Sequence, residues 1–347
     1  MTLFPFRLLA LASAAVLLLA PAGHAQIGGD PDALPELAGL QVEPLPENTF
    51  RTEAGLVVEA VPRGGALYEV RGRSEAFEEP QALELAALVA AATGFGADIE
   101  EPVLEFLQRA VPELAGAGPS AVGIDHFRLT LEVSGEAAPF ELSFALSLAE
   151  VPPAAFPEAR HAKGPADAPI VVREFSDFQC PACRRFNLEV MPQLEAALLS
   201  RGDVRIEYHH FPLMGSFPNS FRAAEAAECV ADANAADDGA FWTYQRALYV
   251  EQPEWGRLGD PDERFVQIAA QEGLEVDDVA RCLAEGRHEQ SVLEAYQAAM
   301  ALQLRGTPSI FVGGFQIQNF GDLNAYQRAI GYLEAFGAVE RAAGESD

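Results

Sequence analysis

Two cysteines separated by two residues, Cys180 and Cys183 in "FSDFQCPACRRF", are the side chains of this sequence best suited to chemistry. Such a pair can be a redox-active dithiol, half of a metal site, or an ordinary structural disulfide. A cysteine attacks a disulfide only as a thiolate, and an unperturbed thiol pKa of about 8.5 leaves little thiolate at neutral pH. Redox chemistry therefore requires a local structure that lowers the pKa of one thiol.

The residues on either side of the pair predict such a structure. The run "PIVVREF" at 169–175 is nearly continuous in apolar residues, as in a strand buried on both faces, and a helix should begin at Pro181. Cys180 would lie at the start of that helix, where free amides and the helix dipole favour a thiolate. We expect Cys180 to be the exposed, attacking sulfur and Cys183, one turn further on, to be the resolving sulfur.

The elements that follow predict the rest of a folded unit. A second strand, "DVRIEYHHFPL", is followed by mostly helical residues at 217–305, by a hairpin in "TPSIFVGGFQIQNF", and by a closing helix in "GDLNAYQRAIGYLEAFG". A strand, a CxxC pair and a helix in a βαβ-like setting indicate a thioredoxin-like redox unit.

The stretch "EFSDFQCPACRRF", with the later "GTPSIFVGG", resembles the DsbA-like branch of the thioredoxin-fold thiol–disulfide oxidoreductases. The resemblance covers about residues 163–340. It implies an α/β thioredoxin-like fold with an inserted helical subdomain at about 217–305. By the same resemblance, Glu174 would be a buried carboxylate that helps to move the proton of the resolving cysteine. It further implies a catalytic pair and an active-site loop with a cis-proline at Pro308, formed by Cys180, Cys183, Pro181, Ala182, Thr307 and Pro308.

One position departs from the pattern of the family. The strongest oxidases of this family carry a histidine before the second cysteine, where this sequence has Ala182. Alanine donates no side-chain hydrogen bond and carries no charge, so we expect a less extreme potential than those oxidases have. Thr307 occupies a position that tunes potential and partner choice in thioredoxin-like proteins. The role of oxidase is favoured, and reductase or isomerase is the alternative.

Composition and the N-terminus indicate the setting. The formal net charge of −29 gives a surface that repels phosphate backbones, so no nucleic-acid partner is expected. Arg7 precedes an apolar run at 8–20 that is short for a membrane anchor, and small residues end at Ala25. Residues 1–25 therefore predict a signal peptide cleaved near Ala25, with an uncleaved anchor as the alternative. The protein is expected in the periplasm or outside the cell, where disulfides persist.

The other two cysteines, Cys229 and Cys282, lie in separate predicted helices of the insertion. A structural disulfide between them is expected, with a second redox pair, metal ligands or two buried thiols as alternatives. Their spacing suits zinc poorly, and no metal site is predicted. His209 and His210 point to opposite faces of one strand, so both cannot join one site. Two further histidines are expected on the surface, His161 and His288.

The chain divides into a small N-terminal unit and the redox unit. Proline-rich and glycine-rich residues 26–49 predict a flexible linker, and 151–162 a second one. Between them, 50–150 reads as a small α+β domain without cysteine, whose role is unknown. A homodimer through residues 50–148 is a further expectation, and residues 341–347 form a tail.

The expected function is disulfide exchange with cysteine-containing secreted proteins. No cofactor is needed because the electrons reside in the sulfurs, and a membrane or soluble redox partner would recycle the enzyme. The alternative from another class is a non-enzymatic secreted chaperone or thiol metal carrier.

Overall fold

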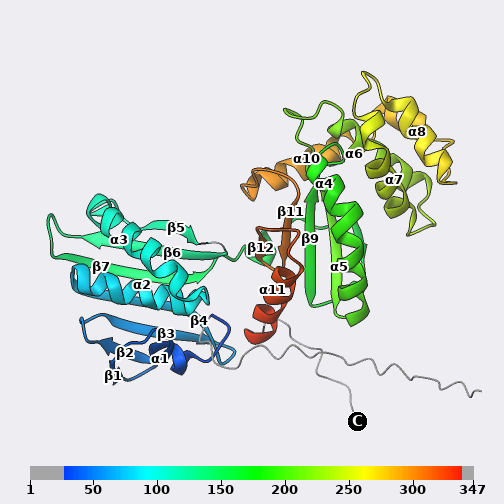
Figure 1. Ribbon diagram of the computed structural model, residues 1–347. Coiled ribbons are helices and arrows are strands. Elements are labelled where there is room, and N and C mark those ends of the chain that lie inside the picture. Colours follow the sequence, from blue (N-terminus) through cyan, green and yellow to red (C-terminus); the bar gives the residue numbers. More distant parts are fainter. Residues whose placement is uncertain (1–26, 125, 338–347) are drawn as a thin grey trace, which may run out of the picture.

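The computed structural model describes residues 27–124 and 126–337, which form two units that each contain a sheet (Figure 1). The predicted signal peptide at 1–25 and the tail at 341–347 lie outside the described residues. Within the described ranges, no helix is both long enough and apolar enough to cross a bilayer.

The N-terminal unit is an antiparallel sheet in the order β1-β2-β3-β4-β7-β6-β5, with two helices across one face (Figure 1). Strands alternate between buried and exposed residues, as β6 does with Phe127, Leu129, Leu131 and Val133 buried, because only one face packs on the helices. The strands are β1 (Val42–Leu45), β2 (Thr49–Thr52), β3 (Val57–Arg63), β4 (Ala66–Phe77), β5 (Ser120–Ile124), β6 (Phe127–Ser134) and β7 (Phe140–Leu148). The helices are α1 (Leu34–Leu37), α2 (Glu79–Thr93) and α3 (Glu100–Leu114), with short 3₁₀ turns at Pro31–Ala33 and Gly96–Ile99.

The prediction of a flexible linker at 26–49 is wrong for the described part of that segment. Ile27 and Leu34 are fully buried in the core, and the segment contains α1 and β1. The Ile27 amide donates to the carbonyl of Ala92 at 2.7 Å, and the Gly28 amide donates to that of Leu67 at 2.7 Å. Gly28 and Gly39 in this segment have positive φ angles, 96° and 66°. The glycines of the segment therefore form turns of an ordered chain.

The C-terminal unit has the predicted thioredoxin-like fold. Its sheet has the order β12-β11-β9-β10-β8, with β9 (Ile170–Ser176) at the centre. Strand β9 runs parallel to β10 (Val204–His210) and antiparallel to β11 (Ser309–Val312). The edges are β12 (Phe315–Ile317) and β8 (His161–Lys163), and α11 (Leu323–Ala335) packs beside the sheet.

The helix after the CxxC pair is not uniform. Helix α4 (Pro181–Arg185) continues through a π-helical turn, Phe186–Val190, into α5 (Met191–Leu198) and a final 3₁₀ turn, Leu199–Arg201. Pro192 near the start of α5 has no amide hydrogen to donate, so the regular α pattern is interrupted just before it. The interruption leaves Asn187 buried, facing the sheet.

The inserted helices are α6 (Ser220–Ala233), α7 (Ala240–Trp255), α8 (Asp262–Gln271), α9 (Val279–Glu285) and α10 (Glu289–Ala301). The first four of them, α6 to α9, form a second small core above the sheet (Figure 1). The core that they share includes Phe178, Cys180 and Cys183, so the dithiol lies where the insertion meets the sheet.

The two units are packed together. Tyr332 and Phe336, at the end of the C-terminal unit, contact His126 and Tyr68 of the N-terminal sheet at ring distances of 6.4 and 5.1 Å. Within the predicted linker 151–162, the Val151 amide donates to the carbonyl of Gly314 at 2.9 Å. That segment also contains the 3₁₀ turn Pro153–Ala155 and the start of β8. The prediction of a plain linker is therefore wrong in part, because this connection is tied to the sheet.

Candidate active site

Cys180 occupies the N-cap position of α4, at the end of the loop that follows β9. Its backbone is extended, with φ −72° and ψ 124°, and Pro181 begins the helix. The amide of Arg184 closes the first turn on the carbonyl of Cys180 at 3.0 Å. Cys183 lies in that turn and is fully buried, and the structure holds both cysteines as free thiols. The local sequence thus brings the two sulfurs to one end of the helix.

The expectation that Cys180 is exposed is wrong for this reduced state. Only 6% of the residue's surface is accessible. The Thr307–Pro308 peptide bond is cis, and this loop packs over the sulfur. While it is protonated, the Cys180 thiol donates to the carbonyl of Thr307 at 3.4 Å. The Thr307–Pro308 loop is far from Cys180 in the sequence. The sequence around the helix start therefore could not predict that this loop covers the sulfur.

The two thiols differ strongly in acidity. A hydrogen bond from the Cys183 thiol is the main cause that lowers the pKa of Cys180 to about 5, against the opposing effect of burial. The backbone amides of Ala182 and Cys183 act in the same direction with smaller effect, so the predicted helix-start contribution is present but secondary. Burial raises the pKa of Cys183 well above its usual value. The pair therefore holds one thiolate and one thiol at neutral pH.

Thr307 contributes to this balance through its hydroxyl. That hydroxyl favours the Cys180 thiolate, although its Oγ1 is buried and makes no ordinary hydrogen bond to the described residues. The role of this position in tuning the potential stays a prediction.

Glu174 lies on β9 and is almost completely buried, with 1% of its surface exposed. The Asn187 side-chain amide donates to its Oε1 at 2.6 Å and to the carbonyl of Cys183 at 3.1 Å. The hydroxyl of Ser176 interacts with both the Glu174 carboxyl and the Cys183 thiol. Burial raises the pKa of Glu174 to about 7, so this carboxyl can exchange a proton at neutral pH.

A second buried carboxylate, Asp177, lies closer to Cys180 in sequence than Glu174 does. It was not among the site residues predicted from the sequence. Its Oδ1 accepts from the Gln179 amide and its Oδ2 from the Leu213 amide, both at 2.7 Å. Burial raises its pKa to about 7. The signal was available, because Asp177 follows the apolar run closely and lies three residues before Cys180, where burial of an acid is plausible from sequence.

The inserted helices also hold the active-site loop in place. The side-chain amide of Gln252 in α7 donates to the carbonyls of Phe178 at 2.7 Å and Cys180 at 3.0 Å. The Arg184 guanidinium donates to the carbonyl of Tyr249 at 2.9 Å. These contacts join segments that are distant in sequence, and no local pattern marks Gln252 as a partner of the dithiol.

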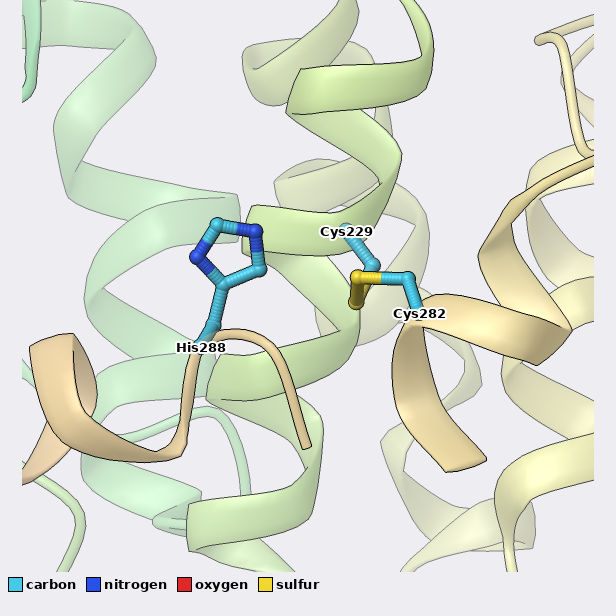
Figure 2. Close-up of side chains that lie close together, drawn as sticks. All are labelled: Cys229, Cys282 and His288. Carbon is cyan, nitrogen blue, oxygen red and sulfur yellow. A yellow bond between two sulfur atoms is a disulfide. The ribbon is translucent and has the colours of Figure 1, made fainter. Parts of the chain in front are cut away.

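Cys229 of α6 and Cys282 of α9 form the predicted structural disulfide (Figure 2). Both residues are 2% exposed. His288 lies beside them in Figure 2, and its Nε2 is 2.9 Å from the carboxylate of Asp232. The expectation that His161 and His288 are surface residues is wrong, because each side chain is only 10% exposed.

We expect the reduced protein to lose one thiol proton near pH 5, far below the value of about 8.5 for a free cysteine. Because folding depresses this pKa, the thiolate stabilises the reduced fold fully above about pH 8.5, and this contribution disappears as the pH falls through 5. Ultraviolet absorbance of the thiolate during a pH titration measures the midpoint, with Cys180→Ser as the control. A midpoint at the free-cysteine value would contradict the described geometry.

Comparisons with known proteins show the family of the C-terminal unit. The sequence model of the family described as Thioredoxin matches residues 157–331. Disulfide bond formation protein D of Bacillus subtilis is 28% identical over 177 residues, 48% of this chain and 73% of that protein. The probable disulfide bond formation protein D of Bacillus anthracis is 28% identical over 153 residues, 44% of this chain and 68% of that protein.

A second group of relatives is much longer than the shared region. The Na(+)/H(+) antiporter NhaA 3 of Salinispora tropica is 31% identical over 183 residues, covering 53% of this chain but 26% of the antiporter. This chain thus spans about a quarter of the length of such antiporters.

Among solved structures, oxidised BdbD of Bacillus subtilis matches with a TM-score of 0.45 and 23% identity, over 50% of this chain and 91% of that chain. The family match extends over half of this sequence, from the connection before β8 into α11. The chain therefore belongs to the thioredoxin family.

Proposed function

We propose that this protein acts as an oxidase that introduces disulfides into cysteine-containing secreted proteins through Cys180 and Cys183. The observation that carries the proposal is the low pKa of Cys180, about 5, beside a thiol of raised pKa. A thiolate that is stable at neutral pH stabilises the reduced dithiol, so the corresponding disulfide is a good oxidant. Reductase or isomerase remains the alternative within the family.

The reaction begins with the dithiol in its disulfide form. A substrate thiolate attacks the sulfur of Cys180, forming a mixed disulfide and releasing the sulfur of Cys183. A second substrate thiolate then attacks the substrate sulfur of the mixed disulfide and releases Cys180 as a thiolate. Two electrons pass from the substrate to the protein, which is left with one thiolate and one thiol. Cys180 is the better leaving group because its pKa is lower.

Release of Cys183 requires a proton, because burial makes its thiolate unfavourable. Glu174 is protonated in about half of the molecules near pH 7, and Ser176 interacts with both groups. We assign to Glu174 the delivery of this proton in the oxidase direction and its removal in the reverse direction. Asn187 would hold the carboxyl in place through its bond to Oε1.

The variant Glu174→Gln should slow formation of the mixed disulfide on the order of a hundredfold, because the amide keeps the hydrogen bond from Asn187 but carries no mobile proton. Single-turnover rates across pH 5–9 should also lose the wild-type inflection near 7. The control is Glu189→Gln, which changes an exposed carboxylate in the π-helical turn that also contains Asn187. An unchanged pH profile in Glu174→Gln would remove Glu174 from the mechanism.

The equilibrium potential, measured against glutathione mixtures, tests the direction of the reaction. A strong oxidant lies near −120 mV and a reductant near −270 mV. We expect a value on the oxidising side, less extreme than the first figure because Ala182 supplies no charged or hydrogen-bonding side chain. A value near the second figure would favour the reductase, and no exchange with glutathione would favour a non-enzymatic chaperone or thiol metal carrier.

The remaining parts of the proposal concern the setting. Residues 1–25 would direct the chain to the periplasm or the exterior, and a membrane or soluble redox partner would reoxidise the dithiol. A homodimer through residues 50–148 would favour an isomerase, and the mass of the protein in solution decides this. The sheet face opposite α2 and α3 would be the contact surface, since Tyr332 and Phe336 already cover one end of this unit.

A further inference from the structure

Three buried or nearly buried ligand-type side chains meet at the β8 edge of the sheet, on the side that faces the insertion. His161 lies on β8, and its strand partner on β10 is Tyr208. His210 is two residues beyond Tyr208, so its side chain emerges on the same face of β10. Glu228 enters from α6 between the two rings. Their side chains are 10%, 8% and 3% exposed for His161, His210 and Glu228.

The spacing of the three side chains suits a small cation. Nε2 of His161 lies 2.8 Å and Nε2 of His210 lies 2.7 Å from the same oxygen, Oε1 of Glu228. The three ligand atoms lie within 4.8 Å of one another. In a tetrahedral zinc site, ligands at about 2.1 Å from the metal are about 3.4 Å apart. The two nitrogens would each have to move away from the Glu228 oxygen by roughly 0.6–0.7 Å to make room for the metal.

The contacts of the group leave one ring nitrogen unused. Among the described residues, Nδ1 of His210 is buried and has no hydrogen-bond partner, so the present contacts do not satisfy this ring completely.

The cluster opens on a cavity of about 430 Å³ between the sheet edge and α10. Two further carboxylates, Glu158 and Glu294, line this cavity, together with Arg160. The Arg160 guanidinium lies 2.7 Å from Oε2 of Glu228, and its side chain is 46% exposed. Its charge opposes a cation, but it also pairs with Asp232 and can move toward solvent. The cavity leaves room for water as a fourth ligand.

We propose that His161, His210 and Glu228 form a binding site for a divalent transition metal of the zinc type, with the fourth position open to the cavity. Two imidazoles and one carboxylate are a ligand set that zinc uses. The neighbouring group of Cys229, Cys282 and His288 is not the site, because its two sulfurs are bonded to each other (Figure 2). A bound metal would join β8 and β10 to α6, and so fasten the insertion to the sheet.

Cobalt titration of the untagged, fully oxidised protein tests the site, because closing the Cys180–Cys183 disulfide removes both thiols as competing ligands. We expect one Co²⁺ per chain with visible bands of tetrahedral strength, displaced by Zn²⁺. His161→Gln and His210→Gln should each weaken Co²⁺ binding by about tenfold to a hundredfold. Arg160→Gln should strengthen binding, since it removes the charge that opposes the cation.

His126→Gln is the matched control, because His126 lies on the N-terminal unit, and it should bind Co²⁺ as the wild type does. Near-ultraviolet circular dichroism and the rate of disulfide exchange establish that each variant is folded. Absence of Co²⁺ binding by the wild type at millimolar metal would overturn the proposal. Equal affinities of folded His161→Gln, His210→Gln and wild type would also overturn it.

Discussion

Replacing Cys180 by serine should reduce disulfide exchange by more than about a thousandfold, because it removes the only low-pKa sulfur of the pair and with it the covalent route. Replacing Cys183 by serine should have a different effect. A substrate disulfide would still be attacked by the Cys180 thiolate, but the mixed disulfide would persist because no second sulfur resolves it. Loss of Cys180 and loss of Cys183 should therefore give different results, no exchange in the first case and a persistent mixed disulfide in the second.

A peptide with one internal disulfide, followed by mass spectrometry, separates the two outcomes. The wild-type dithiol should release reduced peptide, Cys183→Ser should accumulate a covalent adduct on Cys180, and Cys180→Ser should do neither. The variant Glu189→Gln is a suitable control, since it changes an exposed side chain in the turn after α4 without removing a sulfur. Equal rates for Cys180→Ser and wild type would end the enzymatic interpretation, and adducts on Cys183 would reverse the assigned roles.

The predictable part of the site is the part encoded by neighbours in sequence. An apolar strand, a CxxC pair and a proline at the first helical position were enough to place Cys180 at the helix start. Glu174 was singled out by the resemblance, because its place inside an apolar run allows either an edge or a buried position, and the structure shows it buried. The thioredoxin-like sheet followed from the order of these elements and from the resemblance.

The parts that escaped prediction depend on contacts between distant segments. The burial of Cys180 comes from the Thr307–Pro308 loop, and the anchoring of its carbonyl comes from Gln252 on α7. The histidines at 161 and 288 were expected on the surface because their flanking residues are polar. Residues 27–49 were taken for a linker because proline and glycine mark both turns and disorder, and only the burial of Ile27 and Leu34 distinguishes the two.

Removing the Cys229–Cys282 disulfide should lower the free energy of unfolding of the inserted helices by about 4 kcal/mol, the value that the chain-entropy model gives for a closed loop of 53 residues. Both sulfurs are buried, so Cys229→Ala/Cys282→Ala also loses some packing. Urea unfolding followed by tryptophan fluorescence isolates this region, because Trp242 and Trp255 both lie on α7.

Two comparisons separate the covalent contribution from other causes. Wild-type protein whose disulfides have been reduced keeps the sulfur atoms of Cys229 and Cys282 but not the bond between them. The difference between its free energy of unfolding and that of Cys229→Ala/Cys282→Ala therefore measures packing alone. The Cys180→Ser/Cys183→Ser variant lacks the dithiol, so the stability that it loses on reduction measures the Cys229–Cys282 bond alone. Since the disulfide joins α6 to α9, and the groups that lower the pKa of Cys180 are Cys183, Thr307 and two backbone amides, this pKa should stay near 5 in Cys229→Ala/Cys282→Ala. If Cys229→Ala/Cys282→Ala were as stable as the oxidised wild type, the Cys229–Cys282 bond would not hold the insertion together. If the pKa of Cys180 returned to the free-cysteine value in that variant, the bond would also support the redox site.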